Sequence, residues 1–174
     1  TIDIGINKIM SNIKNQIYVK ENAVTVGECD NLIKRFHKHE WFLSPGYVGD
    51  REEKQDVKKS TDLTLPWNIV RQHKDFLPFS TALHNGFTEY IKELEDIINH
   101  NPMVVLFNLF NMQWYKPGEG FYEYHSELNP GAPDASASRC AAWMFNLNTI
   151  KNGGGTEFKY SDDRIEPKAG QLSI

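Results

Sequence analysis

The sequence predicts an α+β fold with helices in the first half of the chain and β-strands in the second. Before residue 101, apolar residues recur at helical spacing, whereas after Pro102 β-branched and aromatic residues alternate with polar ones. Short β-patterns separated by Gly, Pro, Asn and Asp follow, which is typical of a sandwich, a jelly roll or a barrel. The helices are expected to support one face of the sheet.

Size and composition favour one domain over residues 1–174, because a chain of 174 residues can enclose a sizeable core. Hydrophobic residues are 40% and charged residues 24%, ordinary values for a soluble globular protein. The net charge of −4 and the scattered basic residues give no reason to expect a nucleic-acid or membrane partner. Lys58 and Lys59, the densest basic cluster, are expected on a solvated surface.

The sequence also predicts a cytoplasmic protein. Cys29 and Cys140 lie far apart and form no CxxC motif, so a reducing compartment is expected. The N-terminal residues lack the apolar block of a signal peptide. No apolar run approaches the roughly 20 residues that span a bilayer.

The first helix is expected to begin at a capping box, in which Thr25 is the N-cap and Glu28 reaches back to it. Its apolar face would comprise Val26, Cys29, Leu32, Ile33 and Phe36. Residues 41–66 predict loop and short strand, with a turn at Pro45 and Gly46.

A second helix is expected from about Ser80 to a stop at residues 99–102, where Pro102 disfavours helix. One face of this helix carries apolar residues at helical spacing. These are Leu83, Phe87, Tyr90, Leu94 and Ile97.

Strands are expected over residues 103–115, 139–148 and 155–160, and another begins at Gly170. In the first of them, alternate residues share one face. These are Val105, Phe107, Leu109, Asn111, Gln113 and Tyr115. A glycine turn at residues 153–155 precedes the third strand.

His125 and Glu127 stand two residues apart shortly after a Pro-Gly turn. On a strand, residues i and i+2 point to the same side, so these two side chains would project together. An imidazole and a carboxylate are two of the three ligands of the facial triad that holds non-haem Fe(II). Alone, a His-x-Glu pair is more typical of a protein surface, so the interpretation depends on the surrounding motifs.

Those motifs resemble the prolyl 4-hydroxylase class of Fe(II)/2-oxoglutarate-dependent oxygenases. That class carries a Tyr-x-Pro-Gly turn, then His-x-Asp, an Arg-led strand ending in Leu-Asn, a Gly-Gly-x-Thr-x-Phe motif and a Pro-x-x-Gly turn. Over residues 113–174 this chain has, in the same order, QWYKPGEGFYEYHSE, RCAAWMFNLN, GGGTEF and IEPKAGQLSI. More weakly, DVKKSTDLTL over residues 56–65 resembles the N-terminal strand of the class.

The resemblance implies a double-stranded β-helix, that is, a jelly roll, with supporting N-terminal helices. The mixed helical part would cover about residues 1–101 and the jelly-roll core about 102–174. It further implies that His125 and Glu127 bind the iron. Tyr115 matches the tyrosine whose hydroxyl contacts 2-oxoglutarate, with packing in the core as the alternative.

Three further residues are assigned by the same resemblance. Thr156 matches a position that lines the 2-oxoglutarate pocket, although its β-propensity also explains it. Asn146 stands in that pocket where many relatives have tyrosine, which removes one hydroxyl. Arg139 matches an arginine at the mouth of the substrate site, and a salt bridge with Asp134 or another neighbour is the alternative.

The chain departs from the class in its metal ligands. Glu127 replaces the usual aspartate, and its extra methylene moves the carboxylate by roughly 1.5 Å, about one C–C bond. The class has a second metal histidine and then a Lys or Arg that binds 2-oxoglutarate, and we expect both beyond Ile174. The five earlier histidines are expected in the surface or the core: His37, His39, His73, His84 and His100. Because a strand cut at QLSI would be an unpaired apolar edge, we infer a truncated core.

The resemblance implies a dioxygenase that uses Fe(II), 2-oxoglutarate and O2, with ascorbate as accessory reductant, to hydroxylate an unactivated C–H bond. Peptidyl proline is the substrate that the class suggests. Two alternatives stay open: the same chemistry on a free amino acid, lipid or other small molecule, and a jelly-roll binding module without a working metal site.

Overall fold

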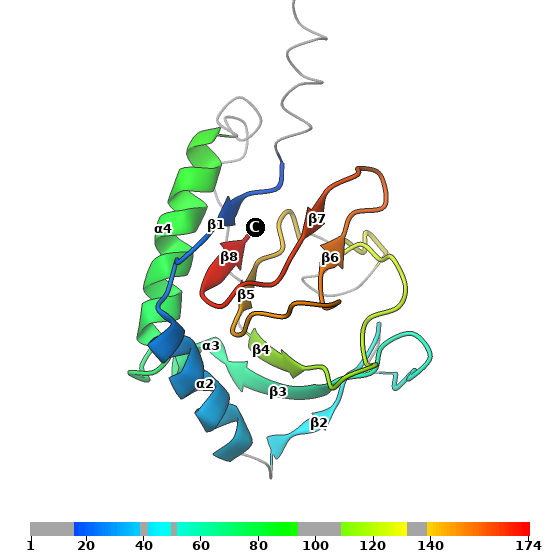
Figure 1. The fold of residues 1–174 in the computed structure, drawn as a ribbon, viewed down its shortest axis with the longest axis horizontal. Coiled ribbons are helices and arrows are strands. Elements are labelled where there is room, and N and C mark those ends of the chain that lie inside the picture. The colour runs from blue at the N-terminus through cyan, green and yellow to red at the C-terminus, as the bar shows by residue number, and fades with distance from the viewer. Residues whose placement is uncertain (1–15, 39–41, 50–51, 94–108, 132–138) are drawn as a thin grey trace, which may run out of the picture.

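The structure is a computed structural model, and it describes residues 16–38, 42–49, 52–93, 109–131 and 139–174. Two longer helices, α2 (Val26–Lys38) and α4 (Leu77–Glu93), lie at one side of several small β-sheets (Figure 1). A single-turn helix, α3 (Trp67–Val70), directly follows a strand. The α+β class predicted from the sequence is confirmed.

The strands form three antiparallel sheets, and within the described residues none of these sheets closes into a barrel. The first has the order β2 (Ser44–Pro45), β3 (Thr61–Pro66), β4 (Leu109–Trp114). The second has the order β1 (Val19–Lys20), β8 (Gln171–Ser173), β5 (Met144–Asn146), and the third pairs β6 (Thr156–Glu157) with β7 (Arg164–Ile165).

The start of α2 is the capping box that the sequence predicts. Thr25 N donates to Glu28 Oε2 at 2.7 Å, and Glu28 N donates to Thr25 Oγ1 at 3.2 Å, so each satisfies a backbone group at the helix end. The side chains of Cys29, Leu32 and Phe36 are buried. Val26, the first apolar residue of the series at helical spacing, is by contrast 56% exposed.

Helix α4 begins at Leu77, three residues before the predicted start at Ser80. Pro78 lies in its first turn, where the missing backbone N–H has no helical partner to lose. Leu83 and Tyr90 are buried as expected, and Phe87 is half-buried. The predicted face residues Leu94 and Ile97 and the predicted stop lie outside the described residues.

The core lies between the helices and one face of the β2–β3–β4 sheet, as predicted. Strand alternation in β4 buries Phe110 and Met112 and exposes Leu109, Asn111 and Gln113. The buried cluster joins sheet and helix residues: Leu63, Phe110 and Met112 from strands, and Cys29, Leu32, Phe36, Phe79 and Ala82 from helices. The expected strand residues 103–108 lie outside the described part of the chain.

Strand β8 lies between β1 and β5, with Leu172 fully buried. The expectation that this strand would be an unpaired edge is therefore wrong, because Val19 and Lys20 supply a partner strand that the sequence pattern did not indicate. Helix α4 also approaches β8 closely, since a Cβ at Gly86 would lie 2.5 Å from Leu172 Cδ2.

Turns and strand lengths differ locally from the expectations. Pro45 lies in edge strand β2, where its missing N–H is tolerated, and the expected turn there is wrong. The turn at Gly153 and Gly154 is confirmed, with φ of +82° and +70°. Only residues 144–146 and 156–157 of the second and third expected strands are paired.

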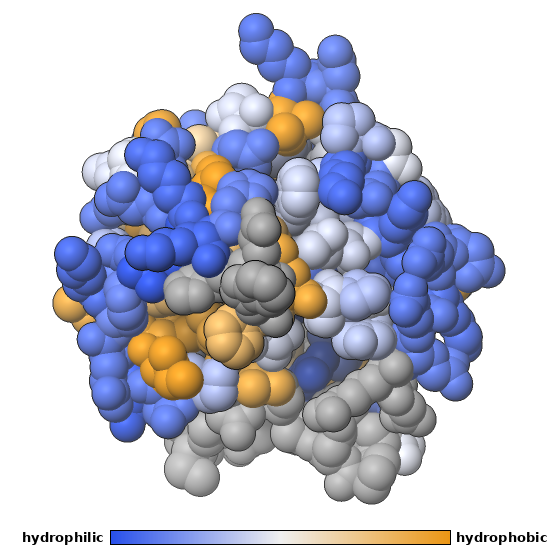
Figure 2. All heavy atoms as spheres, turned by 90° about the horizontal axis from the view of Figure 1, so that it is seen from below, coloured by the Kyte–Doolittle hydropathy of each residue, from blue (hydrophilic) through white to orange (hydrophobic). Residues whose placement is uncertain are grey.

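The surface is mixed in character. Hydrophilic side chains cover much of the face in Figure 2, and hydrophobic ones gather near its middle and lower left. None of the described helices has the length and apolarity needed to cross a lipid bilayer.

Replacing Gly170 by alanine should lower the free energy of unfolding by about 1–3 kcal/mol. Its φ is +82°, and a Cβ there would lie 2.2 Å from Val24 O, at the turn into β8. Urea unfolding of the variant measures the effect. Gly27→Ala in α2 is the control, because no neighbouring atom lies within 4 Å of its added Cβ and alanine favours helix. Equal stability of wild type and Gly170→Ala would contradict the turn described.

Arg35 and Asp75 tie α2 to the segment before α4, with Arg35 Nη2 2.6 Å from Asp75 Oδ2. The hydrogen bond from Arg35 lowers the pKa of Asp75. The pair therefore stabilises the fold above the unfolded-state pKa of about 3.9, and this contribution is lost as pH falls through the lower folded-state pKa.

Asp75→Asn should thus cost about 1 kcal/mol at neutral pH and flatten the decline of stability below about pH 4. Urea midpoints across acidic pH measure this. Glu52→Gln, in an exposed ion pair with Lys54, is the control and should leave the neutral-pH midpoint unchanged. An unaltered acid profile in Asp75→Asn would refute the assignment.

Candidate functional site

The second face of the β3–β4 sheet is polar. Lys58, Ser60 and Asp62 alternate along the chain, and the side chains of Lys58 and Ser60 both reach Asp62. Lys58 and Asp62 are each 4% exposed, so the expectation that Lys58 lies on a solvated surface is wrong. Lys59, which points the other way, is half-exposed.

Asp62 is the centre of this buried polar cluster. Its carboxylate accepts hydrogen bonds from Lys58 Nζ at 2.9 Å, Ser60 Oγ at 2.7 Å and Asn111 Nδ2 at 3.0 Å. Burial, with a smaller contribution from Asp62, raises the pKa of Tyr115 to about 12. A tyrosine hydroxyl is protonated at neutral pH even at its ordinary pKa of about 10, so this one is able to donate.

The segment that carries His125 is attached beside this cluster. Lys58 and Phe121 form an isolated antiparallel bridge. Lys59 N donates to Gly120 O at 2.8 Å, and Tyr122 N donates to Val57 O at 2.8 Å. These bonds hold the start of the segment, and residues 122–128 have no regular strand pairing.

His125 and Glu127 meet, although the strand expected to carry them is not formed. His125 Nε2 lies 3.5 Å from Glu127 Oε1, and each side chain is 45% exposed. The other carboxylate oxygen, Glu127 Oε2, accepts a hydrogen bond from Arg139 Nη1 at 2.6 Å. The alternative of a salt bridge for Arg139 with a neighbour is confirmed, while Asp134 lies outside the described residues.

Two contacts orient the imidazole of His125. Its Nδ1 lies 3.3 Å from Glu123 O, and its ring stacks on Phe121 with centroids 3.9 Å apart and planes 11° from parallel. When Nδ1 donates to Glu123 O, Nε2 turns its lone pair toward Glu127. A proton or a cation between these two atoms would then remove the repulsion between nitrogen and carboxylate.

The spacing of the two atoms fits shared metal coordination. Nitrogen and oxygen ligands lie about 2.0–2.2 Å from a metal such as zinc, so two adjacent ligand atoms are about 3 Å apart at a 90° angle and about 3.4 Å apart at the tetrahedral angle. The 3.5 Å between His125 Nε2 and Glu127 Oε1 is close to that span. The described part of the chain contains no group of three or more His, Cys, Asp or Glu side chains placed to hold a metal.

The three residues expected around 2-oxoglutarate have hydrogen-bond partners of their own. Tyr115 Oη donates to Gln113 Oε1 at 3.0 Å, and Asn146 Nδ2 donates to Gln171 Oε1 at 2.8 Å. Thr156 Oγ1 lies 4.0 Å from Met144 Sδ. Their roles toward a cosubstrate stay predictions.

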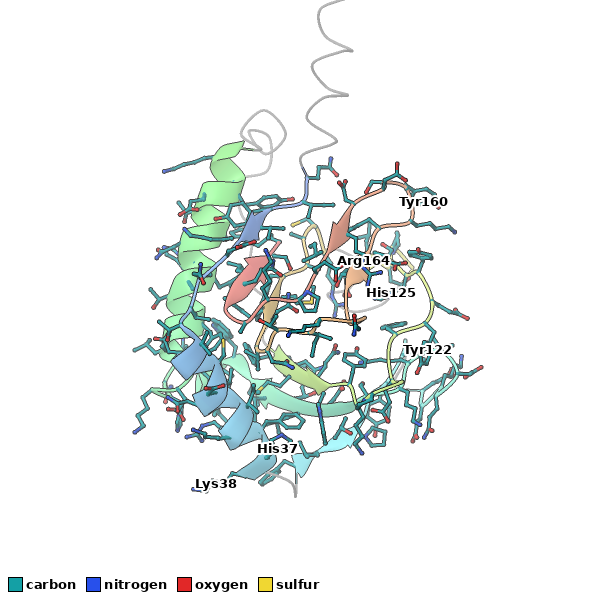
Figure 3. All side chains as sticks on the ribbon, in the orientation of Figure 1. His37, Lys38, Tyr122, His125, Tyr160 and Arg164 are labelled. Atoms are coloured by element: carbon teal, nitrogen blue, oxygen red, sulfur yellow. The ribbon has the colours of Figure 1, made fainter. Side chains whose placement is uncertain are left out.

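The His125 segment also contacts the third sheet, which carries Thr156. Tyr124 Oη lies 3.2 Å from Glu157 Oε2, and Glu157 forms an ion pair with Arg164. Figure 3 shows His125 and Arg164 on the side of the fold that carries β6 and β7, across the molecule from α4. The β2–β3–β4 sheet and the β6–β7 sheet thus border the site.

Sequence reasoning missed the buried cluster and the stacking partner of His125. The alternation of Lys58, Ser60 and Asp62 was a usable signal, because polar residues with a period of two share one face of a strand. Phe121 precedes His125 by four residues, and no period indicates a stack in an unpaired segment.

Comparisons with models of known protein families, with curated proteins and with solved structures find no match.

Proposed function

We propose that His125 and Glu127 are two ligands of an Fe(II) ion in a 2-oxoglutarate-dependent oxygenase. The observation that carries the proposal is the 3.5 Å approach of His125 Nε2 to Glu127 Oε1 in a partly exposed position. Arg139 occupies the second carboxylate oxygen, which leaves one oxygen of Glu127 for the metal. Outer hydrogen bonds of this kind are typical of metal-ligating side chains.

The proposal includes a jelly roll as the specific arrangement of the α+β fold, as the resemblance to these oxygenases implies. The third protein ligand, which the resemblance implies to be a histidine, stays a prediction. So does the basic residue that binds 2-oxoglutarate.

When bound, the iron would supply the oxidation of a C–H bond coupled to decarboxylation of 2-oxoglutarate. The chain's own residues would bind and orient. Glu123 O holds the Nδ1 side of His125, and the Arg139 guanidinium holds Glu127. Tyr115, whose hydroxyl is protonated at neutral pH and whose pKa burial raises to about 12, is suited to donate a hydrogen bond to a carboxylate of the cosubstrate.

Exposed apolar side chains close to His125 in the chain support a substrate with an apolar ring. Phe121, Tyr122, Tyr124 and Leu128 are all exposed. Aromatic side chains offer large apolar areas for packing, and the saturated five-membered ring of a peptidyl proline is an apolar group that can pack on them. This substrate otherwise rests on the resemblance to prolyl 4-hydroxylases.

Tyr115→Phe should raise the 2-oxoglutarate concentration needed for half-maximal turnover about tenfold or more. A hydrogen bond to a charged group contributes about 1.5–3 kcal/mol, which corresponds to that shift. Succinate release by the full chain with Fe(II), ascorbate and a proline-containing peptide measures it. Tyr122→Phe is the matched control, because that hydroxyl donates to Gly118 O in a turn.

The same assay tests the function itself. Succinate should form faster with the peptide than without it, and mass spectrometry should find one added oxygen on the proline. Oxidation of a free amino acid or another small molecule in place of the peptide would make the prolyl assignment wrong. If no compound stimulates succinate release by the full chain, the enzyme proposal fails and the binding-module alternative gains.

A further inference from the structure

His125 lies in a segment with no strand ladder to fix it. Residues 122–128 have no regular pairing, and the side chain of His125 is 45% exposed. An exposed imidazole on such a segment would otherwise sample several rotamers, and ordering it would reduce the affinity for a metal. The flat stack with Phe121, at 3.9 Å between centroids and 11° between planes, restricts the imidazole plane.

Phe121 is itself fixed from the polar face of the sheet. Its backbone bridges Lys58, and Lys58 Nζ lies 6.0 Å from the centre of the Phe121 ring, at the outer limit of a cation–π contact. Lys58 is held in turn by Asp62, at 2.9 Å, in a position only 4% exposed. A series of contacts therefore leads from the buried Lys58–Asp62 ion pair, of which Asp62 lies on β3, to the His125 ring.

We infer that Phe121 is a positioning residue for His125, and that the buried Lys58–Asp62 pair holds the Phe121 ring in place. The inference rests on the proposed function in one respect, because the consequence of positioning is a higher metal affinity. The order of the imidazole itself exists without any metal. The two parts can therefore be tested separately.

The first test is proton NMR of the metal-free full chain at one fixed pH. A ring stacked on an aromatic face experiences its ring current, so the His125 ring protons should resonate upfield of those of exposed histidines. His125→Ala identifies the signals. Phe121→Leu should move them to the positions of exposed histidines, and Phe121→Tyr should keep them upfield.

The matched control for this test is Tyr122→Leu. It removes the neighbouring aromatic ring, which is exposed and whose hydroxyl donates a hydrogen bond to Gly118 O, and should leave the His125 signals in place. His125 signals at ordinary positions in the wild type, or unmoved in Phe121→Leu, would overturn the positioning role.

The second test is the anaerobic Fe(II) affinity of the same proteins. Phe121→Leu should bind Fe(II) about tenfold or more weakly, the range known for residues that orient metal ligands, while Phe121→Tyr and Tyr122→Leu should match the wild type. If Phe121→Leu bound Fe(II) with the affinity of the wild type, the inference would be overturned, whereas the proposed metal site would not be affected. No Fe(II) binding by the wild type would instead overturn the proposed function, and the NMR result would still decide whether Phe121 orders His125.

The role of Lys58 needs a variant that leaves no unpaired buried charge. Lys58→Met combined with Asp62→Asn meets this condition. The folded double variant should show His125 signals shifted part of the way toward those of Phe121→Leu. Signals identical to those of the wild type would overturn the part of the inference that assigns Lys58 and Asp62 to holding Phe121.

Discussion

Lys58→Met should lower the free energy of unfolding by about 3 kcal/mol or more. The variant leaves Asp62 as a buried carboxylate without its cation, and removing one partner of a buried pair typically costs about 3–5 kcal/mol. The two side chains are each 5% exposed, with Lys58 Nζ 2.9 Å from Asp62 Oδ2, so water cannot replace the lost ammonium. Ser60 and Asn111 still donate to Asp62, which favours the lower part of that range.

Urea unfolding of the full chain measures this effect, and two further variants serve as comparisons. Lys59→Met removes the adjacent, half-exposed lysine and should change the stability by less than about 0.5 kcal/mol. Adding Asp62→Asn to Lys58→Met should recover part of the loss, because no unpaired charge is then buried. If Lys58→Met and Lys59→Met were equally stable, the buried pair would not exist in solution.

His125→Ala should reduce the Fe(II) affinity of the full chain by more than about 100-fold, because loss of an outer partner of a ligand alone costs about 10–100-fold. The fold should survive, since His125 is partly exposed and lies in a segment without strand pairing. Anaerobic titration with Fe(II) measures the affinity, and circular dichroism checks the fold.

His84→Ala is the matched control for that titration. This histidine is exposed on α4, away from the His125 segment, and its loss should leave the affinity unchanged. Equal losses in both variants would indicate nonspecific binding by surface histidines. An unchanged affinity in His125→Ala would remove that residue from the metal site.

Sequence patterns predicted the elements that depend on local signals. The capping box of α2 needs only Thr25 and Glu28, and the alternation in β4 needs only the order of its residues, so both were predictable. Strand β1 was not, because two residues, Val19 and Lys20, carry no periodicity and become a strand only by pairing with β8. Pairing between distant segments is decided by tertiary contacts, which a local pattern does not contain.

In the candidate site, too, the features with a local sequence signal were predictable and those decided by tertiary contacts were not. The approach of His125 to Glu127 was predicted from i, i+2 geometry, which an extended chain keeps even without a paired neighbour. The expectation for Lys58 was wrong because charge alone suggests exposure, whereas Asp62 and Asn111, brought together by β3 and β4, make burial of the lysine acceptable.

The most direct test of the proposed metal site is an anaerobic spectrum of the full chain with Fe(II) and 2-oxoglutarate. Joint binding of both to one site produces a weak visible charge-transfer band. We expect this band in the wild type and its absence in His125→Ala and in Glu127→Ala, with both variants folded. A band of wild-type intensity in either variant, or no band in the wild type, would contradict coordination of iron by His125 and Glu127.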